Sequence, residues 1–132
     1  MALKIVTASA GSGKTFRLTQ EYLILCFKHG PNYFSRILGM TFTNKAAWEM
    51  KESILQELDL LAHQPEKSKH KERLIEALPR YKGREDKLRE KAAAIQREVL
   101  LKYHDFSLTT IDSFFQRIVR AFFRELNLAS NF

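Results

Sequence analysis

The chain has 132 residues, 45% of them hydrophobic, which is enough for one folded domain with its own core. Its 22 Lys and Arg residues outnumber 15 Asp and Glu, and the net charge of +7 favours a polyanionic partner such as nucleic acid or an acidic membrane surface. No stretch approaches the roughly 18 consecutive apolar residues of a membrane span. Because a single cysteine excludes an internal disulfide, we expect a soluble cytoplasmic protein.

The first predicted element is a short buried strand, "LKIVTA" (residues 3–8), which runs into a loop rich in Gly and Ser. Residues 8–15 read A-S-A-G-S-G-K-T, the phosphate-loop pattern G-x-x-x-x-G-K-[ST] with Ala8 in place of its first Gly. Backbone N–H groups of this loop would hold the β-phosphate of ATP, Lys14 would reach the β- and γ-phosphates, and the Thr15 hydroxyl would bind Mg²⁺. The alternative is a strand-to-helix turn that binds nothing. The predicted ATP-binding residues are Ser9, Ala10, Gly11, Ser12, Gly13, Lys14, Thr15 and Phe16, with Lys14 catalytic and Thr15 the metal ligand.

A helix is expected after the loop, from Thr15 to Gly30, because this stretch has no internal Gly or Pro. The next apolar run, "SRILGMTF" (residues 35–42), predicts a second strand, and Thr43 and Asn44 are good N-caps for the helix that follows it. Apolar residues of that helix recur every three or four positions and predict one buried stripe: Ala47, Met50, Ile54, Leu58 and Leu61.

The stretch from 64 to 104 is the most basic part of the chain, with twelve Lys and Arg against seven Asp and Glu. Pro65, Pro79 and Gly83 divide its first part into short pieces. Its second part, "DKLREKAAAIQREVLLKY", is a strong helix by propensity. One side of that helix is apolar: Leu88, Ala92, Ile95 and Val99. We interpret residues 64–104 as a helical basic insert.

"FSLTTI" (residues 106–111) predicts a third strand, followed by a helix from Asp112 or Ser113 to Leu126. On a helical projection, one arc holds Phe115, Ile118, Val119, Phe122 and Leu126, and the opposite, solvated face holds Arg117, Arg120 and Arg124. Strands therefore alternate with helices, which predicts an α/β fold with a partial parallel sheet and right-handed crossovers. Three strands are about half of an average sheet, so we expect the remainder of the sheet to be missing from this chain.

Polar side chains follow the second and third strands, at the carboxyl edge of the sheet where the phosphate loop also lies. Thr41, Thr43 and Asn44 suit a phosphate oxygen, and the flat ring of Phe42 suits a stacked base. Thr110, Asp112 and Ser113 occupy the corresponding turn at the third strand. Simple structural alternatives remain open for these residues, as helix caps or, for Phe42, as part of the core. Asp112 has a further alternative, a Walker B ligand of Mg²⁺.

Three segments, "ASAGSGKT", "TFTNKAA" with the nearby "EMK", and "TTIDSFFQRIVR", resemble motifs I, Ia and Ib of superfamily 1 DNA helicases of the UvrD/Rep family. The resemblance covers residues 3–58 and 106–126 and leaves out the basic insert. It implies a RecA-like P-loop NTPase fold in which residues 1–132 form the amino-terminal part of motor domain 1A. Motif Ia then spans 41–51 and motif Ib spans 108–119. The start of the chain directly at its first strand is more similar to the RecB and AddA branch of repair helicase-nucleases.

The same resemblance implies the roles of the polar residues. The loop would bind ATP and Mg²⁺, and the DNA-binding residues would be Thr41, Phe42, Thr43, Asn44, Thr110, Asp112 and Ser113, although UvrD-like members usually have His at the position of Asp112. A full-length member would be an ATP-dependent DNA helicase that acts on single- and double-stranded DNA, in some members with a partner subunit in a helicase-nuclease complex, and away from membranes. Because the chain ends before the Walker B acids and the arginine finger, we expect it to be inactive alone.

Two other functions remain open from the residues alone. The chain could be a small, complete P-loop kinase that uses Asp112 for magnesium and the basic insert as an anion-binding lid. It could also be a nucleic-acid-binding module without enzymatic activity.

Overall fold

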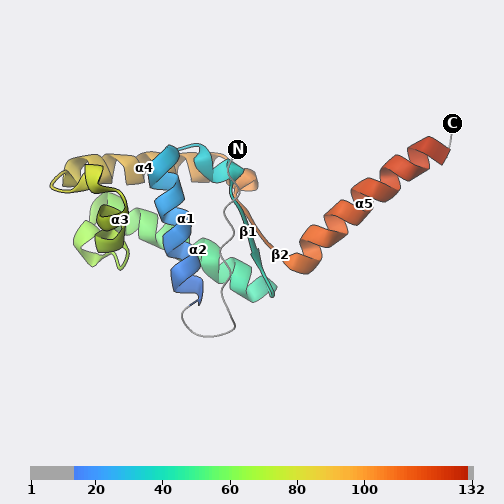
Figure 1. Ribbon diagram of the computed structural model, residues 1–132, viewed down its shortest axis with the longest axis horizontal. Helices are drawn as coiled ribbons and strands as arrows, with labels where there is room; N and C mark the ends of the chain where they lie inside the picture. The colour runs from blue at the N-terminus through green and yellow to red at the C-terminus, as the bar shows by residue number, and fades with distance from the viewer. Residues whose placement is uncertain (1–13, 131–132) are drawn as a thin grey trace.

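The computed structural model describes residues 14–130, with side chains from Phe16 to Asn127. The predicted strand at 3–8 and the loop residues 9–13 lie outside the described residues. Five α-helices and two strands are present in the described part: α1 (Lys14–His29), β1 (Leu38–Thr41), α2 (Asn44–His63), α3 (Lys71–Ala77), α4 (Glu85–Leu101), β2 (Ser107–Thr110) and α5 (Ile111–Ser130). Four short 3-10 helices connect them: η1 (Tyr33–Arg36), η2 (Pro65–Lys67), η3 (Pro79–Tyr81) and η4 (Tyr103–Asp105). The fold is thus α/β, mostly helical, with a small parallel sheet, as Figure 1 shows.

The two strands pair in parallel, and the pairing fixes which residues share the end of the sheet. Leu38 is aligned with Ser107 at one end, and Thr41 with Thr110 at the other. Between them Gly39 lies against Leu108 so closely that a Cβ atom on Gly39 would collide with a methyl carbon of the leucine side chain. A larger residue at position 39 would therefore force the strands or the Leu108 side chain to move.

The predicted second strand is shorter than its apolar run, and the third strand is close to its prediction. Residues 33–36 form η1 instead of strand, because this turn places Phe34 fully inside the core. The second strand therefore begins only at Leu38. The helix after the third strand begins at Ile111, earlier than predicted, and continues past Leu126 to Ser130.

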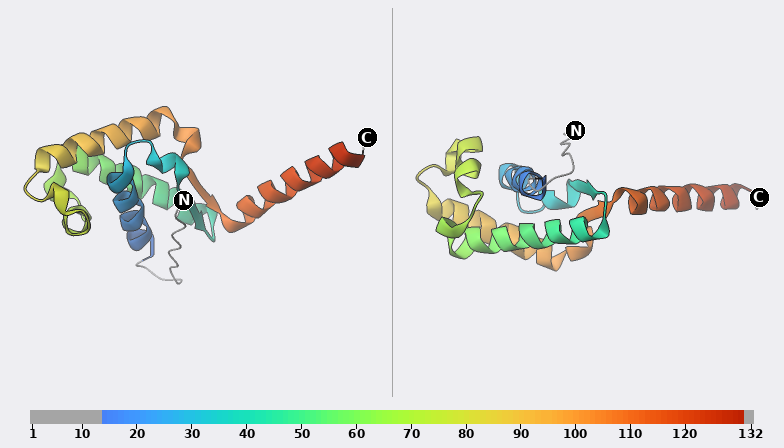
Figure 2. Two further views of the ribbon diagram at one scale, coloured as in Figure 1. Left: turned by 45° about the horizontal axis from the view of Figure 1, so that its top comes forward. Right: turned by 90° about the horizontal axis from the view of Figure 1, so that it is seen from below.

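The core lies between α1, α2 and α4, which cross one another on one side of the sheet (Figure 2). The predicted stripe of α2 is confirmed, since Ala47, Met50, Ile54, Leu58 and Leu61 are all buried. The predicted apolar side of α4 is confirmed as well, since Leu88, Ala92, Ile95 and Val99 are all fully buried. Helical spacing of three or four residues places these side chains on single faces, and packing of those faces builds the core.

The basic insert is an integral part of this core. Its breaks fall where the sequence predicts them: Pro65 starts η2, Pro79 starts η3, and Gly83 has a positive φ of 69° that suits glycine. Two of its arginines cap the carboxyl ends of neighbouring helices, because Arg80 donates to the Phe27 and Lys28 carbonyls and Arg89 donates to the Ala62 and His63 carbonyls. These cationic side chains satisfy free carbonyls at the negative ends of two helix dipoles.

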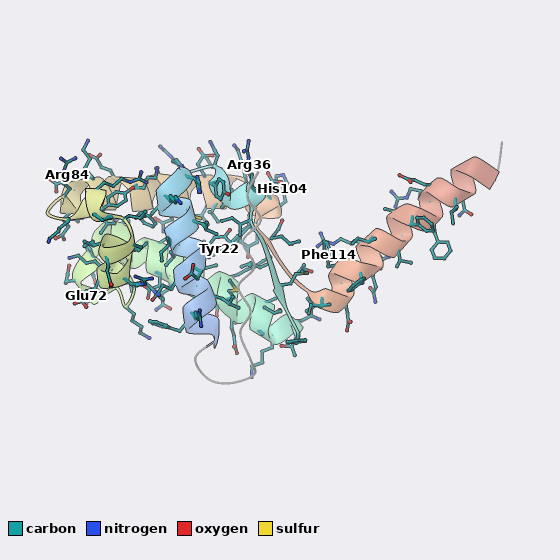
Figure 3. All side chains as sticks on the ribbon, in the orientation of Figure 1. Tyr22, Arg36, Glu72, Arg84, His104 and Phe114 are labelled. Carbon is teal, nitrogen blue, oxygen red and sulfur yellow. The ribbon has the colours of Figure 1, made fainter. Side chains whose placement is uncertain are left out.

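Helix α5 leaves the body of the protein at the end of β2 and extends away from it (Figure 1). Its predicted apolar arc is therefore largely exposed, with 46–59% of each side chain accessible: Phe115, Ile118, Val119, Phe122 and Leu126. Glu72 on α3 and Arg84 before α4 lie at the far end of the molecule from Phe114 on α5 (Figure 3). Within residues 14–130, no helix is both long and apolar enough to cross a membrane.

Candidate nucleotide and nucleic-acid site

The two polar turns predicted from the sequence meet at the carboxyl end of the sheet. β1 ends at Thr41 and β2 at Thr110, and these two residues are direct partners in the parallel pairing. The start of α2 and the start of α5 consequently lie next to each other, at the ends of adjacent strands. This juxtaposition joins motif Ia to motif Ib in one surface.

In the first turn, two threonines organise the backbone. The side chain of Thr41 is 9% exposed, and its hydroxyl donates to the Thr43 carbonyl at 2.9 Å. Thr43 is the N-cap of α2, since its hydroxyl accepts from the Ala46 N–H at 3.0 Å, and Asn44 is the first helical residue. The predicted capping function of Thr43 is thus confirmed, and both hydroxyls hold the chain in a sharp turn.

Phe42 lies between these two threonines and has the opposite exposure. It is 76% accessible, more than any other large apolar side chain for which exposure is described. The core interpretation of Phe42 therefore does not hold in this structure. A ring presented to solvent by a fixed turn is suitable for base stacking.

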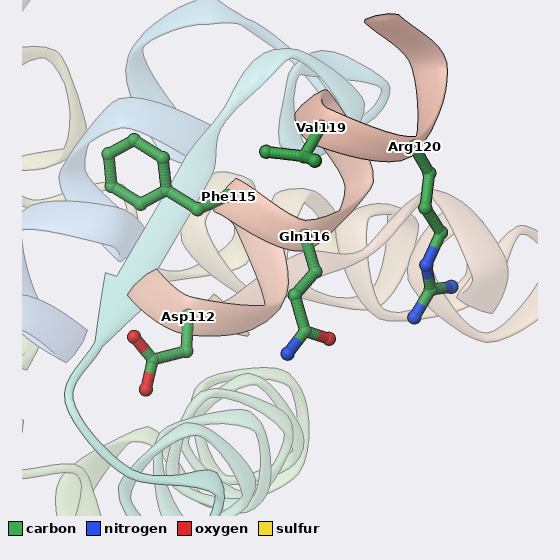
Figure 4. A pocket seen from close by; sticks show the side chains of 5 residues that line it. All are labelled: Asp112, Phe115, Gln116, Val119 and Arg120. Carbon is green, nitrogen blue, oxygen red and sulfur yellow. The ribbon is translucent and has the colours of Figure 1, made fainter. Parts of the chain in front are cut away.

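The second turn repeats the arrangement with a buried threonine. Thr110 is 5% exposed, donates to the Ser113 hydroxyl at 2.8 Å and accepts from the Ser113 N–H at 3.1 Å. Asp112 is exposed and lies at the edge of a shallow groove along α5 (Figure 4). This groove is lined by residues of α5 alone: Asp112, Phe115, Gln116, Val119 and Arg120. Among the described residues, no three His, Cys, Asp or Glu side chains are grouped so that they could hold a metal ion.

The described part of the nucleotide site is the amino-terminal end of α1. Lys14 and Thr15 are the first two residues of this helix, directly after the predicted loop. The first N–H groups of any α-helix have no partner within the helix, and they carry a partial positive charge that suits phosphate oxygens. Ser9, Ala10, Gly11, Ser12 and Gly13 lie outside the described residues, so their roles stay predictions.

Phe16, the third residue of α1, contacts the basic insert. Its ring stacks on the imidazole of His70, with centroids 4.4 Å apart. His70 is 1% exposed, and its Nδ1 atom has no hydrogen-bond partner among the described residues. Its backbone N–H donates to the Ser68 hydroxyl, which in turn donates to the buried carboxylate of Glu57 on α2 at 2.6 Å.

Sequence reasoning missed this cluster of His70, Ser68 and Glu57. One signal was present, because Glu57 lies at helical spacing within the apolar stripe of α2, between Ile54 and Leu61. A carboxylate on the buried face of a helix needs a buried partner. The identity of that partner, Ser68, follows only from the tertiary structure.

Burial of His70 predicts a loss of stability in mild acid. Burial lowers the pKa of His70 below its usual 6.5, the nearby Glu57 carboxylate partly opposes that decrease, and Lys69 adds to it. Since the unfolded chain takes up this proton below about pH 6.5 and the folded chain resists it, the stability contribution is complete above pH 6.5 and is lost as the pH falls through the folded-state pKa. Urea unfolding of the wild-type chain and His70→Phe from about pH 7 to about pH 5 should therefore show a smaller decrease in the variant. An equal reduction of the slope in His104→Phe, at an exposed histidine, would contradict this assignment.

Comparison with known proteins identifies the family. The model of the UvrD/REP helicase N-terminal domain matches residues 3–132. The chain belongs to this family. An ATP-dependent helicase/nuclease subunit from Thermoanaerobacter sp. strain X514 is 33% identical over 130 residues, which is 97% of this chain and 8% of that protein. RecBCD enzyme subunit RecB from Haemophilus influenzae is 40% identical over 62 residues, which is 42% of this chain and 5% of that protein.

A probable DNA helicase II homolog from Mycoplasma capricolum is 53% identical over 51 residues, which is 39% of this chain and 7% of that protein. The chain thus spans less than a tenth of the length of these relatives. No solved structure matches the chain significantly.

Proposed function

We propose that this chain is the amino-terminal, nucleotide- and DNA-binding part of an ATP-dependent DNA helicase. The pairing of Thr41 with Thr110 is the observation that carries the proposal, because it brings the TFTN and TTIDS turns together at one edge of a parallel sheet. The start of α1 supplies Lys14 and Thr15, and membership of the UvrD/REP family supports a RecA-like P-loop fold for the complete domain. On this proposal residues 1–132 belong to motor domain 1A, and the protein acts in the cytoplasm.

The first turn of α1 fits the phosphates of ATP. Its free N–H groups and the Lys14 ammonium would bind phosphate oxygens. The Thr15 hydroxyl would be one of six oxygen ligands of Mg²⁺, with the others from phosphates and water, as is usual for this ion. The Mg–ATP unit would supply the phosphoryl group whose transfer to water drives translocation.

The DNA strand would lie across the two polar turns. Phe42 would stack on a base, while Thr43, Asn44 and Ser113 would contact phosphates beside two helix N-termini. Thr41 and Thr110, whose hydroxyls are engaged within the turns, would act by shaping the backbone. Asp112 is exposed beside them and would lie at the border of this surface.

Phe42→Ala is expected to weaken binding of single-stranded DNA about tenfold or more, since one stacked base contributes about 1–3 kcal/mol. The measurement is fluorescence anisotropy of a labelled oligonucleotide at fixed salt. Phe123→Ala, a matched loss of an exposed ring on α5, should leave the affinity unchanged. Loss of thermal stability with unchanged DNA affinity would overturn the assignment of Phe42.

The relatives favour one branch of the family. The alignments with the helicase/nuclease subunits extend over 97% of the chain and therefore include the basic insert, whereas the helicase II homolog aligns over only 39%. We therefore propose a helicase of the RecB and AddA type that works in double-strand-break repair with a partner subunit of a helicase-nuclease complex.

A phosphate-release assay distinguishes this proposal from the kinase alternative, which the comparisons do not favour. The 132-residue chain should bind Mg–ATP weakly and release no phosphate above background, with or without single-stranded DNA. The reason is that a clamping arginine alone contributes about 10³–10⁵ in rate and the described residues include no grouped carboxylates for magnesium. Robust turnover that Asp112→Ala abolishes would replace the helicase proposal with the kinase.

A further inference from the structure

A buried polar cluster lies beneath the first turns of α1. His70 and Ser68 of the insert and Glu57 of α2 form one side of it, through the hydrogen bonds described above. Thr19 of α1 is fully buried, and its hydroxyl lies 3.4 Å from the Ser53 hydroxyl of α2. The first two turns of α1 are therefore held from two directions, by the insert at Phe16 and by α2 at Thr19.

Stability alone does not account for the histidine in this cluster. A buried polar atom without a partner costs free energy, and a ring without nitrogen at position 70 would avoid the cost at Nδ1. What the imidazole does contribute is a flat surface against Phe16, which is itself 45% exposed and otherwise at the margin of the fold. The Ser68–Glu57 hydrogen bond fixes the backbone that carries this ring.

The stacked ring is one residue from Thr15 and two from Lys14. In an α-helix the carbonyls of residues 14, 15 and 16 accept hydrogen bonds from the N–H groups of residues 18, 19 and 20. Order in this first turn is what sets the positions of the Lys14 and Thr15 backbones. Without an external contact, the first turn of a helix frays readily.

We propose that His70 is a positioning residue for the nucleotide site: the Ser68–Glu57 pair holds it against Phe16, and the stack keeps the first turn of α1 ordered for phosphate binding. The basic insert thereby acts as a brace for the phosphate loop, a function for residues 64–104 that their charge does not indicate. The nucleotide part of this inference rests on the proposed ATP site, while the ordering of α1 does not.

The test uses the 132-residue chain and two measurements. The first is amide hydrogen exchange at Leu18, Thr19 and Gln20, whose N–H groups report the first turn directly. Because an aromatic pair of this kind shifts an equilibrium by about two- to tenfold, His70→Ala should lower their protection by about that factor. The second measurement is the affinity for a fluorescent ATP analogue with Mg²⁺, which should fall by a similar factor because only the ordered fraction binds.

Variants separate positioning from simple loss of stability. His70→Phe should restore both protection and affinity, because it keeps a ring against Phe16. Phe16→Ala should reproduce the effects of His70→Ala, and the double variant should add nothing further, as expected for two residues that act through one contact. Val99→Ala, which removes fully buried methyl groups from α4, should leave both local measurements unchanged.

Unchanged amide protection at residues 18–20 in both His70→Ala and Phe16→Ala would overturn the inference, as would an equal loss in Val99→Ala. If His70→Ala does not fold, Phe16→Ala makes the same test from the exposed side of the stack. A wild-type chain that binds no nucleotide would contradict the proposed ATP site, and the exchange measurement would still decide whether His70 orders the helix.

Discussion

Phe27→Ala is expected to lower the free energy of unfolding of the chain by about 3–5 kcal/mol, the usual cost of removing a fully buried aromatic ring. Phe27 is fully buried near the end of α1 and meets Tyr81 of the insert edge to face, with centroids 6.0 Å apart. Its carbonyl also accepts hydrogen bonds from Arg80 and from the Tyr81 hydroxyl. The substitution therefore leaves a cavity where α1 joins the insert.

Urea unfolding followed by circular dichroism measures this effect. The matched control is Phe123→Ala, in which a ring that is 57% exposed on α5 is removed, and it should change stability by about 0.5 kcal/mol at most. Similar effects of the two substitutions would mean that α5 packs on the body of the protein in solution, contrary to the structure.

Lys14→Ala is expected to weaken binding of Mg–ATP roughly tenfold to hundredfold, because a hydrogen bond to a charged group contributes about 1.5–3 kcal/mol. The lysine is the first residue of α1, and in the proposed site its ammonium reaches the β- and γ-phosphates. Titration of a fluorescent ATP analogue into the 132-residue chain measures the change.

Lys82→Ala removes the same charge from an exposed position in the insert and is the control for general electrostatics. It should leave nucleotide affinity within about twofold, since exposed charges more than about 10 Å apart are largely screened at ordinary salt. Equal losses in Lys14→Ala and Lys82→Ala would assign the affinity to net charge and contradict a specific phosphate loop.

Local patterns predicted most of the helices and their ends. Thr43 caps α2, Pro65 and Pro79 open short turns, and the buried faces of α2 and α4 follow helical spacing. These features depend on residues within about one or two turns of each other, so the sequence contains all the interacting groups. The second strand was predicted too long for the opposite reason: Phe34 enters the core through a 3-10 turn, and the core that receives it is built by distant segments.

The candidate site divides in the same way. The sequence by itself determined the phosphate-loop pattern, the two polar turns and the family, because each is a short contiguous motif. Only the tertiary structure decided that Thr41 is aligned with Thr110, that Phe42 is exposed between two engaged threonines, and that His70 stacks on Phe16. It also decided that Arg80 and Arg89, two of the charges that suggested a nucleic-acid partner, cap α1 and α2. Each of these contacts joins residues more than 20 positions apart or depends on such packing, and no local periodicity records which distant surface a side chain will meet.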